Sequence, residues 1–267
     1  MSSRLLKVEG AGNDFLLGTG SWARRLAEDP ALVRRLCRRH RGIGADGVLA
    51  LLPEESATVR LVYRNADGSE ASFCANGTRC AARGAVELLG MPAAGLTVLT
   101  GWGPVAASVH GELVTLELPP PAASPRTVRL TAADRTWAGW RLTVGVPHLV
   151  LPTTELADLD LTVLGPPLRA HPRLGPEGAN VNFIEHHAPG EAAVRTFERG
   201  VEAETLSCGS GVVAAALCSM AERDVSVLRC ATRSGDELVV EAVGAPPLCP
   251  TRLTGPARFI AAVDPLP

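Results

Sequence analysis

The sequence has only one lysine, Lys7, so nearly all of its positive charge comes from arginine. Pyridoxal phosphate enzymes hold their cofactor through a lysine Schiff base. Lys7 lies near the start of the first expected strand, at residues 4–8, and is poorly placed for that bond. We therefore expect chemistry that does not use pyridoxal phosphate.

The sequence also lacks any apolar run long enough to cross a bilayer, and its first ten residues lack the apolar core of a signal peptide. A formal net charge of −2 does not suggest a nucleic-acid-binding surface. With 46% hydrophobic residues, the chain is expected to be soluble, globular and cytoplasmic, with neither a membrane nor a nucleic acid as partner.

None of the seven cysteines forms a CxxC pair. An odd number of cysteines without close pairing fits a reducing compartment. Cys74 and Cys80 are too far apart for a zinc knuckle, and no second Cys/His pair completes one, so we expect no metal site.

One pattern occurs twice, about half the chain length apart. A Glu is followed four residues later by Cys and three residues after that by Gly, first with Cys74 and again with Cys208. After each cysteine comes a short Gly/Asn/Ser/Thr turn and then an Ala-rich run of helical character. A repeat at half length indicates two similar lobes, each with one cysteine at the start of a helix.

A cysteine at a helix start has chemical meaning. The unpaired N–H groups there bind anions and lower the pKa of a thiol. Two such termini on one substrate carboxylate would let one thiolate remove a proton from carbon while the other thiol delivers one to the opposite face, which is racemisation or epimerisation without a cofactor. Two buried core cysteines are the alternative, and the matched context of Cys74 and Cys208 favours the functional interpretation.

Strands outnumber helices along the chain. We expect helices at 22–40, from about 78 to 89 and from 211 to 223, and a Pro/Gly-rich loop at 160–178. The fold class is predicted as α+β, with two pseudo-symmetric lobes, each a strongly curved, mostly antiparallel sheet around a central helix, and the active site in the cleft between them. The Pro-rich stretch 119–125 marks the boundary, giving lobes 1–120 and 121–253, with about 254–267 a candidate to return to the first lobe.

The Gly-rich stretch around Asn13 is similar to a dinucleotide fingerprint, but Phe15 replaces its third glycine and no helix pattern follows. We interpret it as a backbone turn that presents Asn13. His148, after a turn between two strands, has the pattern of an ordinary histidine at a strand end.

Taken together, the stretches 10–15, 41–47, 65–70, 74–77, 147–148, 180–183, 198–200 and 208–211 make the sequence resemble the diaminopimelate epimerase family. They follow the family's order and span nearly the whole chain. The resemblance implies the two-lobed fold, a cofactor-independent mechanism with two cysteines, a small amino-acid substrate and a homodimer.

The resemblance also implies roles for individual residues. Cys74 and Cys208 would be the catalytic acid and base, with Cys208 the base in the L,L-to-meso direction. His148 and Glu198 would tune the thiol pKa values. The remaining positions would bind substrate: backbone N–H groups of Ala75, Asn76, Gly209 and Ser210 for the reacting carboxylate, Asn13 and Glu198 for its ammonium group, and Arg199, Asn65 and Asn180 for the distal end.

Several positions depart from the family pattern. Val146 stands where the family has an Asn that contacts the distal carboxylate, Gly47 where many members have Gln, and Ala75 where the family has Gly. A backbone N–H survives the change at Ala75. The loop between Arg199 and Cys208 is one residue longer than in the commonest pattern.

The main hypothesis is an isomerase that interconverts L,L- and meso-diaminopimelate for lysine and peptidoglycan synthesis. The departures at Val146 and Gly47 leave room for a relative that racemises another amino acid in specialised metabolism. A non-catalytic amino-acid-binding protein and a thiol redox protein are further alternatives. Both cysteines at helix starts argue against the binding protein, and a redox protein would need them bonded to each other in its working form.

Overall fold

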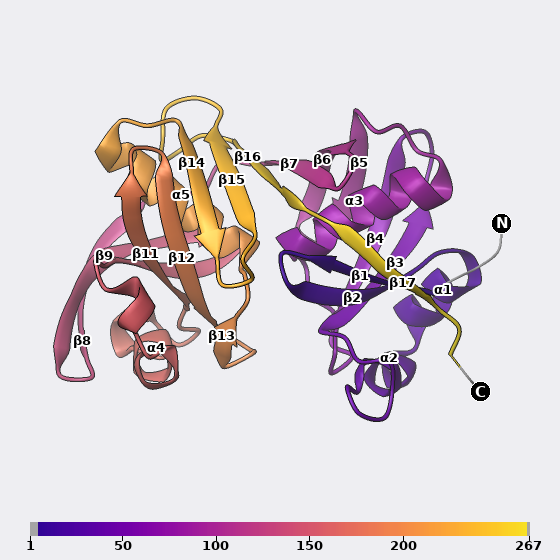
Figure 1. The fold of residues 1–267 in the computed structure, drawn as a ribbon, viewed down its shortest axis with the longest axis horizontal. Helices are drawn as coiled ribbons and strands as arrows, with labels where there is room; N and C mark the ends of the chain where they lie inside the picture. The colour runs from indigo at the N-terminus through magenta and orange to yellow at the C-terminus, as the bar shows by residue number, and fades with distance from the viewer. Residues whose placement is uncertain (1–4, 266–267) are drawn as a thin grey trace. The chain divides into compact units, whose positions relative to one another are not determined.

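The computed structural model describes residues 5–265, and strands prevail among them (Figure 1). This part of the chain contains five α-helices, and its strands pair both parallel and antiparallel. The expected α+β class is confirmed. Within the described residues, no helix combines the length and apolar composition needed to cross a membrane.

The chain divides into two compact units. Unit 1 comprises the residues up to Glu117 together with those from Gly255 onward, and unit 2 comprises Leu118–Thr254. Unit 1 is therefore built from both ends of the chain.

The strands of unit 1 follow one another as neighbours in a mixed arrangement. They are β1 (Leu5–Gly10), β2 (Asn13–Gly18), β3 (Gly47–Pro53), β4 (Thr58–Asn65), β5 (Leu96–Thr100), β6 (Gly103–His110), β7 (Leu113–Leu118) and β17 (Arg258–Val263). The pairs β2–β3 and β4–β5 are parallel, and the other neighbouring pairs are antiparallel. The yellow β17 lies against the indigo β1 in Figure 1, with Val8 opposite Phe259.

The helix α3 (Ala75–Leu89) packs against several of these strands, among them β1, β3, β5 and β6. Its small residues allow close approach: a Cβ added at Gly84 would lie 2.7 Å from a methyl of Leu17. Gly90 ends the helix with φ of 70°, a left-handed conformation that glycine adopts without strain.

The single helix predicted at 22–40 is wrong, because the segment forms α1 (Gly20–Glu28) and α2 (Pro30–Cys37). Asp29 separates them in an extended conformation, and its carboxylate accepts hydrogen bonds from the N–H groups of Ala31 and Leu32. Pro30 then occupies the first helical position, where its missing N–H costs nothing.

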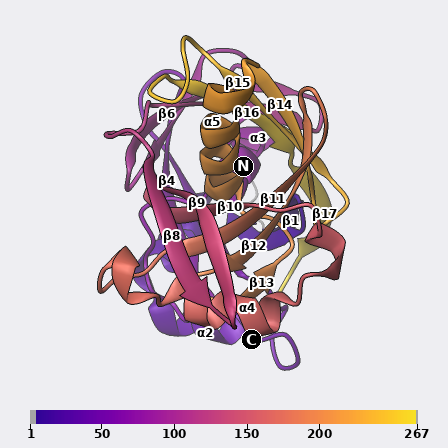
Figure 2. The ribbon, with the colours of Figure 1, turned by 90° about the vertical axis from the view of Figure 1, so that its left-hand side faces the viewer.

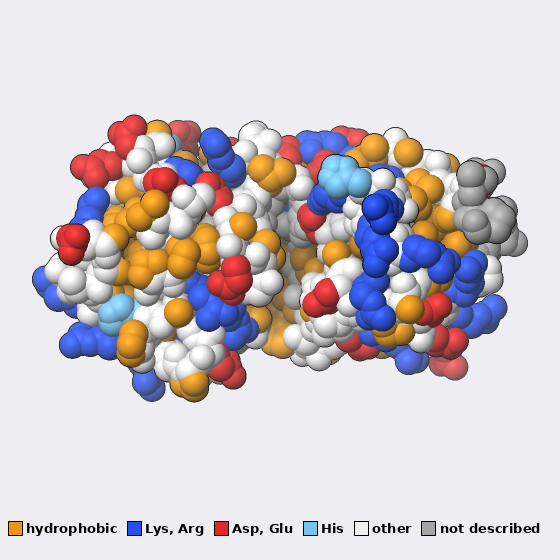
Figure 3. Space-filling view, turned by 90° about the horizontal axis from the view of Figure 1, so that it is seen from below, with side chains coloured by type: hydrophobic (Ala, Val, Ile, Leu, Met, Phe, Trp, Pro, Cys, Tyr) orange, Lys and Arg blue, Asp and Glu red, His pale blue; other side chains and the backbone are white. Residues whose placement is uncertain are grey.

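The arginines that follow α2 in sequence and lie on its outer side are exposed. Figure 3 shows Lys and Arg side chains gathered over unit 1 on the face that it presents. The buried side of α2, with Leu32, Val33 and Leu36, instead joins a core cluster with Leu26 of α1 and Val48 of β3. The apolar side of this segment is therefore part of the core of unit 1.

Unit 2 is also mixed. Its strands are β8 (Arg126–Ala132), β9 (Arg135–Val144), β10 (Val146–Pro152), β11 (Asn180–Ala188), β12 (Glu191–Glu198), β13 (Ala203–Thr205), β14 (Val227–Thr232) and β15 (Glu237–Ala242), and β16 (Thr251–Pro256) crosses from unit 2 into unit 1. The pairs β10–β11 and β12–β14 are parallel. Figure 2 shows α5 (Gly209–Arg223) within these strands, and it packs on β9, β10, β11 and β15.

The loop predicted at 160–178 is also wrong in part. It contains α4 (Leu161–Arg169) and a short 3-10 helix, Pro172–Leu174, and another 3-10 helix, Leu156–Asp158, precedes it. The side chain of Asp160 caps α4, and Leu161 and Leu168 bury the apolar side of the helix against the core of unit 2. Burial of this stripe outweighs the cost of the two prolines within the helix.

Candidate functional site

Cys74 and Cys208 each occupy the N-cap of a buried helix. Cys74 precedes α3 with φ −144° and ψ 112°, and its Sγ accepts a hydrogen bond of 3.4 Å from the N–H of Gly77. Cys208 precedes α5 with φ −125° and ψ 105°. Both thiols thus lie where helix N–H groups have no partner within the helix, in the environment that favours thiolates and anions.

The other five cysteines lie elsewhere in the two cores, and all seven are free thiols. Burial raises the pKa values of Cys37, Cys218 and Cys230 to about 12 and also raises those of Cys80 and Cys249. These thiols stay protonated and inert. Position at a helix N-terminus therefore distinguishes Cys74 and Cys208 from the rest.

Asn13 lies beside the first thiol. The Oδ1 of Asn13 is 3.6 Å from the Sγ of Cys74, and its Nδ2 donates a hydrogen bond of 2.6 Å to the carboxylate of Asp46. The turn before β2 brings Asn13 into place, with Ala11 and Gly12 at φ of 52° and 86°. Asp46 thus fixes the amide so that its oxygen faces the thiol.

Sequence reasoning missed the charged cluster behind this contact. Asp46 accepts from the Nη2 of Arg39 at 2.6 Å, and its N–H donates to Asp14, which also binds Lys7. Burial alone would raise the pKa of Asp14, but the hydrogen bonds from Lys7 and Arg39 hold it below its usual value. The only lysine of the chain therefore supports Asp14 and, through it, the Asn13 turn.

The side chain of Asn76 has a structural role inside unit 1. It is 2% exposed, and its Oδ1 accepts a hydrogen bond of 2.8 Å from fully buried Arg79, whose Nε donates to the carbonyl of Pro256 at 3.2 Å. Ala75 is buried beside it. What Ala75 and Asn76 can offer a ligand is their backbone at the helix start. An arginine inside an Ala-rich run was the sequence signal for this buried network.

Asn65 ends β4 and is held by the chain's only tyrosine. The hydroxyl of Tyr63 donates to the Oδ1 of Asn65 at 2.7 Å, while the Asn65 Nδ2 donates to Ser69 at 3.1 Å. Gly47 lies opposite Asn65 in the sheet, and a Cβ there would lie 2.4 Å from the carbonyl oxygen of Arg64 and 2.8 Å from the Tyr63 ring. The structure therefore leaves no room for a glutamine side chain at position 47.

In unit 2, His148 on β10 lies in register with Asn180 on the parallel strand β11. Asn180 is 4% exposed, and its Oδ1 accepts the backbone N–H of Arg199 at 2.8 Å. Burial lowers the pKa of His148 to about 3, and the charge of Arg199 acts in the same direction. His148 is therefore a neutral imidazole at physiological pH.

Arg199 carries the one strong positive charge of this group. Its guanidinium lies 3.5 Å from the carboxylate of Glu177, an exposed residue of the loop before β11. An ion pair this long and open is weak, so a ligand carboxylate can compete for Arg199. The structure thus groups His148, Asn180 and Arg199 within unit 2.

The remaining predicted residues lie at the end of β12 and at the start of α5. Glu198 is the last residue of β12 and is part-buried, and its carbonyl accepts the N–H of Glu202 at 2.8 Å. Gly209 and Ser210 open α5, and the hydroxyl of Ser210 lies 3.6 Å from the Sγ of Cys208. Among the described residues, no cluster of three or more His, Cys, Asp and Glu side chains could hold a metal ion.

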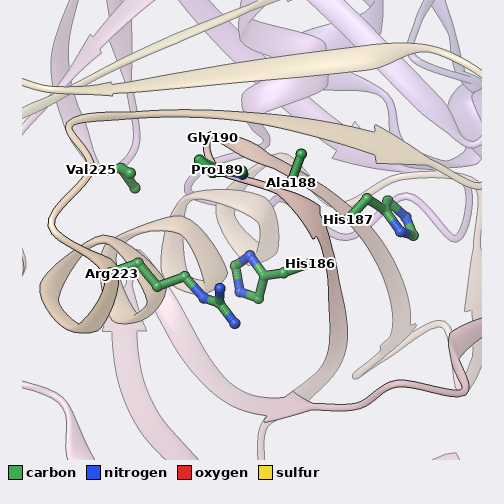
Figure 4. A pocket seen from close by; sticks show the side chains of 7 residues that line it. All are labelled: His186, His187, Ala188, Pro189, Gly190, Arg223 and Val225. Atoms are coloured by element: carbon green, nitrogen blue, oxygen red, sulfur yellow. The ribbon is translucent and has the colours of Figure 1, made fainter.

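A pocket of about 490 Å³ lies at the far end of α5 (Figure 4). His186 to Gly190 line it from the β11–β12 turn, and Arg223 and Val225 line it from the end of the helix. None of the predicted site residues contributes to it. The predicted site residues instead form two groups, one with Cys74 in unit 1 and one with Cys208 in unit 2.

Comparison with known proteins gives a consistent result. A family model described as diaminopimelate epimerase matches residues 5–117 and 141–260. The chain is 37% identical over 246 residues to the diaminopimelate epimerase of Gemmatimonas aurantiaca, covering 88% of this chain and 87% of the other. It is 39% identical over 239 residues to that of Chlorobaculum tepidum, covering 87% and 90%.

Solved structures show the same fold at lower sequence identity. A hydroxyproline epimerase from Agrobacterium vitis superposes with a TM-score of 0.69 at 16% identity, covering 98% of this chain and 90% of the other. A phenazine biosynthesis family protein from Bacillus anthracis gives a TM-score of 0.70 at 14% identity, covering 98% and 99%.

Proposed function

The chain belongs to the diaminopimelate epimerase family, and from that membership we propose that it interconverts L,L- and meso-diaminopimelate, with Cys74 and Cys208 exchanging the proton on the α-carbon. It is an isomerase acting on a small amino acid. The observation that supports the mechanism most is that these two of the seven cysteines, and no others, cap the N-termini of α3 and α5.

The reaction needs one thiolate and one thiol. In the L,L-to-meso direction the Cys208 thiolate takes the α-proton, and the electron pair left on carbon is delocalised into the carboxylate. The Cys74 thiol then gives its proton to the opposite face of the carbon, so that the protonation states of the two cysteines are exchanged after one turnover.

The helix N-termini stabilise the charge that develops on the carboxylate. Backbone N–H groups of Ala75, Asn76, Gly209 and Ser210 are the proposed donors, and the buried Asn76–Arg79 bond supports a role for the backbone rather than the side chain at Asn76. Such preorganised donors act without reorganisation, which makes them effective in a site that excludes water.

The remaining side chains are assigned to the ammonium and carboxylate groups of the substrate by their charge and hydrogen-bonding groups. We assign the substrate ammonium to Asn13 and Glu198, and the distal carboxylate to Arg199, with Asn65 and Asn180 holding the same end. The weak pair between Arg199 and Glu177 supports this, because the guanidinium can exchange partners. His148 and Glu198 are proposed to set the thiol pKa values. We also propose that the enzyme works as a cytoplasmic homodimer without a cofactor.

Substrate identity is tested by proton NMR of the purified enzyme in D₂O with L,L-diaminopimelate, lysine, histidine, arginine and glutamate, each followed for loss of the α-proton signal. We expect exchange with diaminopimelate and formation of the meso isomer. Exchange with another amino acid alone would keep the chemistry and overturn the substrate. Absence of exchange with every compound under reducing conditions would contradict the proposed function.

A further inference from the structure

Asn182, which has no role in the proposed mechanism so far, forms a side-chain hydrogen bond with His148. It lies on β11, is fully buried, and its Nδ2 is 3.2 Å from the Nδ1 of His148. The same Nδ2 donates to the carbonyl of Leu149 at 3.1 Å and is 3.4 Å from that of Asn180. On the other side of the amide, Oδ1 accepts the hydroxyl of Thr196 at 3.0 Å.

These partners fix which way the amide points. A flipped amide would place Oδ1 against the carbonyl oxygens of Leu149 and Asn180, where it could form no hydrogen bond. In the observed orientation Nδ2 donates and Oδ1 accepts from Thr196. Because an amide nitrogen donates only, the Nδ1 of His148 has to be the acceptor.

The proton of a neutral His148 therefore lies on Nε2. That atom is buried and has no partner at normal hydrogen-bond geometry within residues 5–265. Burial lowers the pKa of His148 by more than a backbone hydrogen bond with Val144 raises it. The low pKa of His148 is consistent with a ring that stays neutral. With its proton on Nε2, His148 can donate a hydrogen bond from that atom, but Nε2 cannot take up a further proton.

The amide also lies against the helix that carries the second cysteine. A Cβ added at Gly211, in the first turn of α5, would lie 2.1 Å from the Oδ1 of Asn182 and 3.3 Å from the Sγ of Cys208. Only glycine leaves space for Asn182 at this place. The side chain thus joins His148, Thr196 and the start of α5 in one buried network.

We propose that Asn182 is a positioning residue which, oriented by Thr196, holds His148 as the Nε2–H tautomer, so that His148 serves the site as a neutral hydrogen-bond donor and not as a base. The effect on turnover rests on the proposed function, whereas the tautomer does not. With His148 unable to accept the α-proton, proton transfer is left to the two thiols.

The tautomer is measured by long-range ¹H–¹⁵N NMR of the uniformly ¹⁵N-labelled full chain at pH 7, with His148→Gln to assign the signals. We expect His148 as a single neutral tautomer with its proton on Nε2. A proton on Nδ1, or a charged imidazolium, would overturn the proposal. This readout is independent of turnover, so it remains decisive even if no amino acid in the substrate panel exchanges.

Variants then test the positioning role. Thr196→Val removes the hydroxyl that orients the amide, Thr196→Ser keeps it, and Asn182→Ala removes the amide itself. We expect kcat to fall about tenfold or more in Thr196→Val and Asn182→Ala, with a smaller change in KM and recovery in Thr196→Ser.

The matched control is Ser219→Ala, which also removes a buried hydroxyl. The Ser219 hydroxyl forms a hydrogen bond with His186 of β11 and lies away from Asn182. It should keep the wild-type kcat. If Thr196→Val and Asn182→Ala are folded by circular dichroism and keep kcat within about twofold of wild type, the positioning role is contradicted, while wild-type exchange activity separately decides the proposed function.

Discussion

At the scale of single residues, the two N-cap cysteines differ from the other five by position and not by residue type. The five core thiols have raised pKa values because burial disfavours the thiolate. Removing a thiol at a helix start should therefore affect chemistry, whereas removing a core thiol should affect packing.

Cys74→Ala and Cys208→Ala should each abolish epimerisation, with a loss of at least about 1,000-fold, because each removes one of the two proton carriers. Cys218→Ala, in the buried middle of α5, is the matched control and should keep turnover while lowering stability. The measurement is the rate of meso isomer formation from L,L-diaminopimelate. Full turnover in either site variant would refute the assignment.

His148 predicts a pH dependence of stability. Its pKa is about 3 in the folded protein against an ordinary 6.5, so the unfolded chain binds the proton more readily. The part of the free energy of unfolding that this pKa difference provides is fully present above pH 6.5. It is lost as the pH falls toward 3, at about 1.4 kcal/mol per pH unit.

Urea unfolding of wild type and His148→Gln between pH 7.5 and 4.5 measures this contribution. The wild type should lose more stability on acidification than the variant. His110→Gln, at an exposed position, should behave as wild type. If the free energy of unfolding changes equally with pH in wild type and His148→Gln, the buried His148 does not contribute to the pH dependence of stability.

At the scale of elements, the two site helices show how glycine allows side chains to approach. Gly211→Ala would force a Cβ onto the Oδ1 of Asn182 at 2.1 Å, against a rigid buried amide. Gly84→Ala in α3 meets the Leu17 methyl at 2.7 Å, which is the end of a flexible side chain. We expect Gly211→Ala to cost about 1–3 kcal/mol and to lower kcat, and Gly84→Ala to cost less.

Thermal unfolding and turnover of the two glycine variants check this difference. A Gly211→Ala enzyme with wild-type kcat and melting temperature would mean that Asn182 can move away, which would also weaken the network around His148.

Elements also show what the sequence could and could not predict. The Ala-rich helices expected at about 78–89 and 211–223 are confirmed as α3 and α5, because a long run of small apolar residues after a capping turn has few other outcomes. The apolar stripe of Leu32, Val33 and Leu36 correctly indicates a helix within 22–40. The single helix is wrong because the side chain of Asp29 caps α2 and so starts a second helix there.

The other wrong or missing predictions have one cause, which is that tertiary packing overrides or adds to the local sequence signals. Pro166 and Pro167 argued for a loop, but Leu161 and Leu168 bury α4 in the core of unit 2. The partners of the site residues were hidden for the same reason: Asp46 beside Asn13, Arg79 beside Asn76 and Thr196 beside Asn182 come from other elements or other turns. The roles of the site residues remain predictions.

At the scale of the whole molecule, unit 1 depends on the C-terminal segment. Arg83 donates to the carbonyl of Ala257 at 2.5 Å, the N–H of Ala257 donates to Glu112 at 2.8 Å, and Arg258 pairs with Glu9 at 2.7 Å. Together with the pairing of β17 and β1, these contacts close unit 1 between residues that are far apart in sequence.

A chain ending at residue 254 should therefore lose the structure of unit 1 and keep that of unit 2. Hydrogen exchange measured by mass spectrometry is expected to show fast exchange in peptides from 5–117 and retained protection in peptides from 118–254. A cut after residue 263, which keeps β17, is the matched control. Unchanged protection in both units of the shorter chain would contradict this dependence.

The proposed two-thiol mechanism, in which one cysteine removes the α-proton and the other supplies a new one, is tested most directly by running the reaction in D₂O. The first few per cent of turnover are analysed by mass spectrometry and NMR. With two separate proton carriers, the first meso product carries deuterium at the inverted carbon while the remaining L,L substrate keeps its proton. Product that retains the original proton would show that a single base returns it, which would contradict the assignment of Cys74 and Cys208 as an acid–base pair.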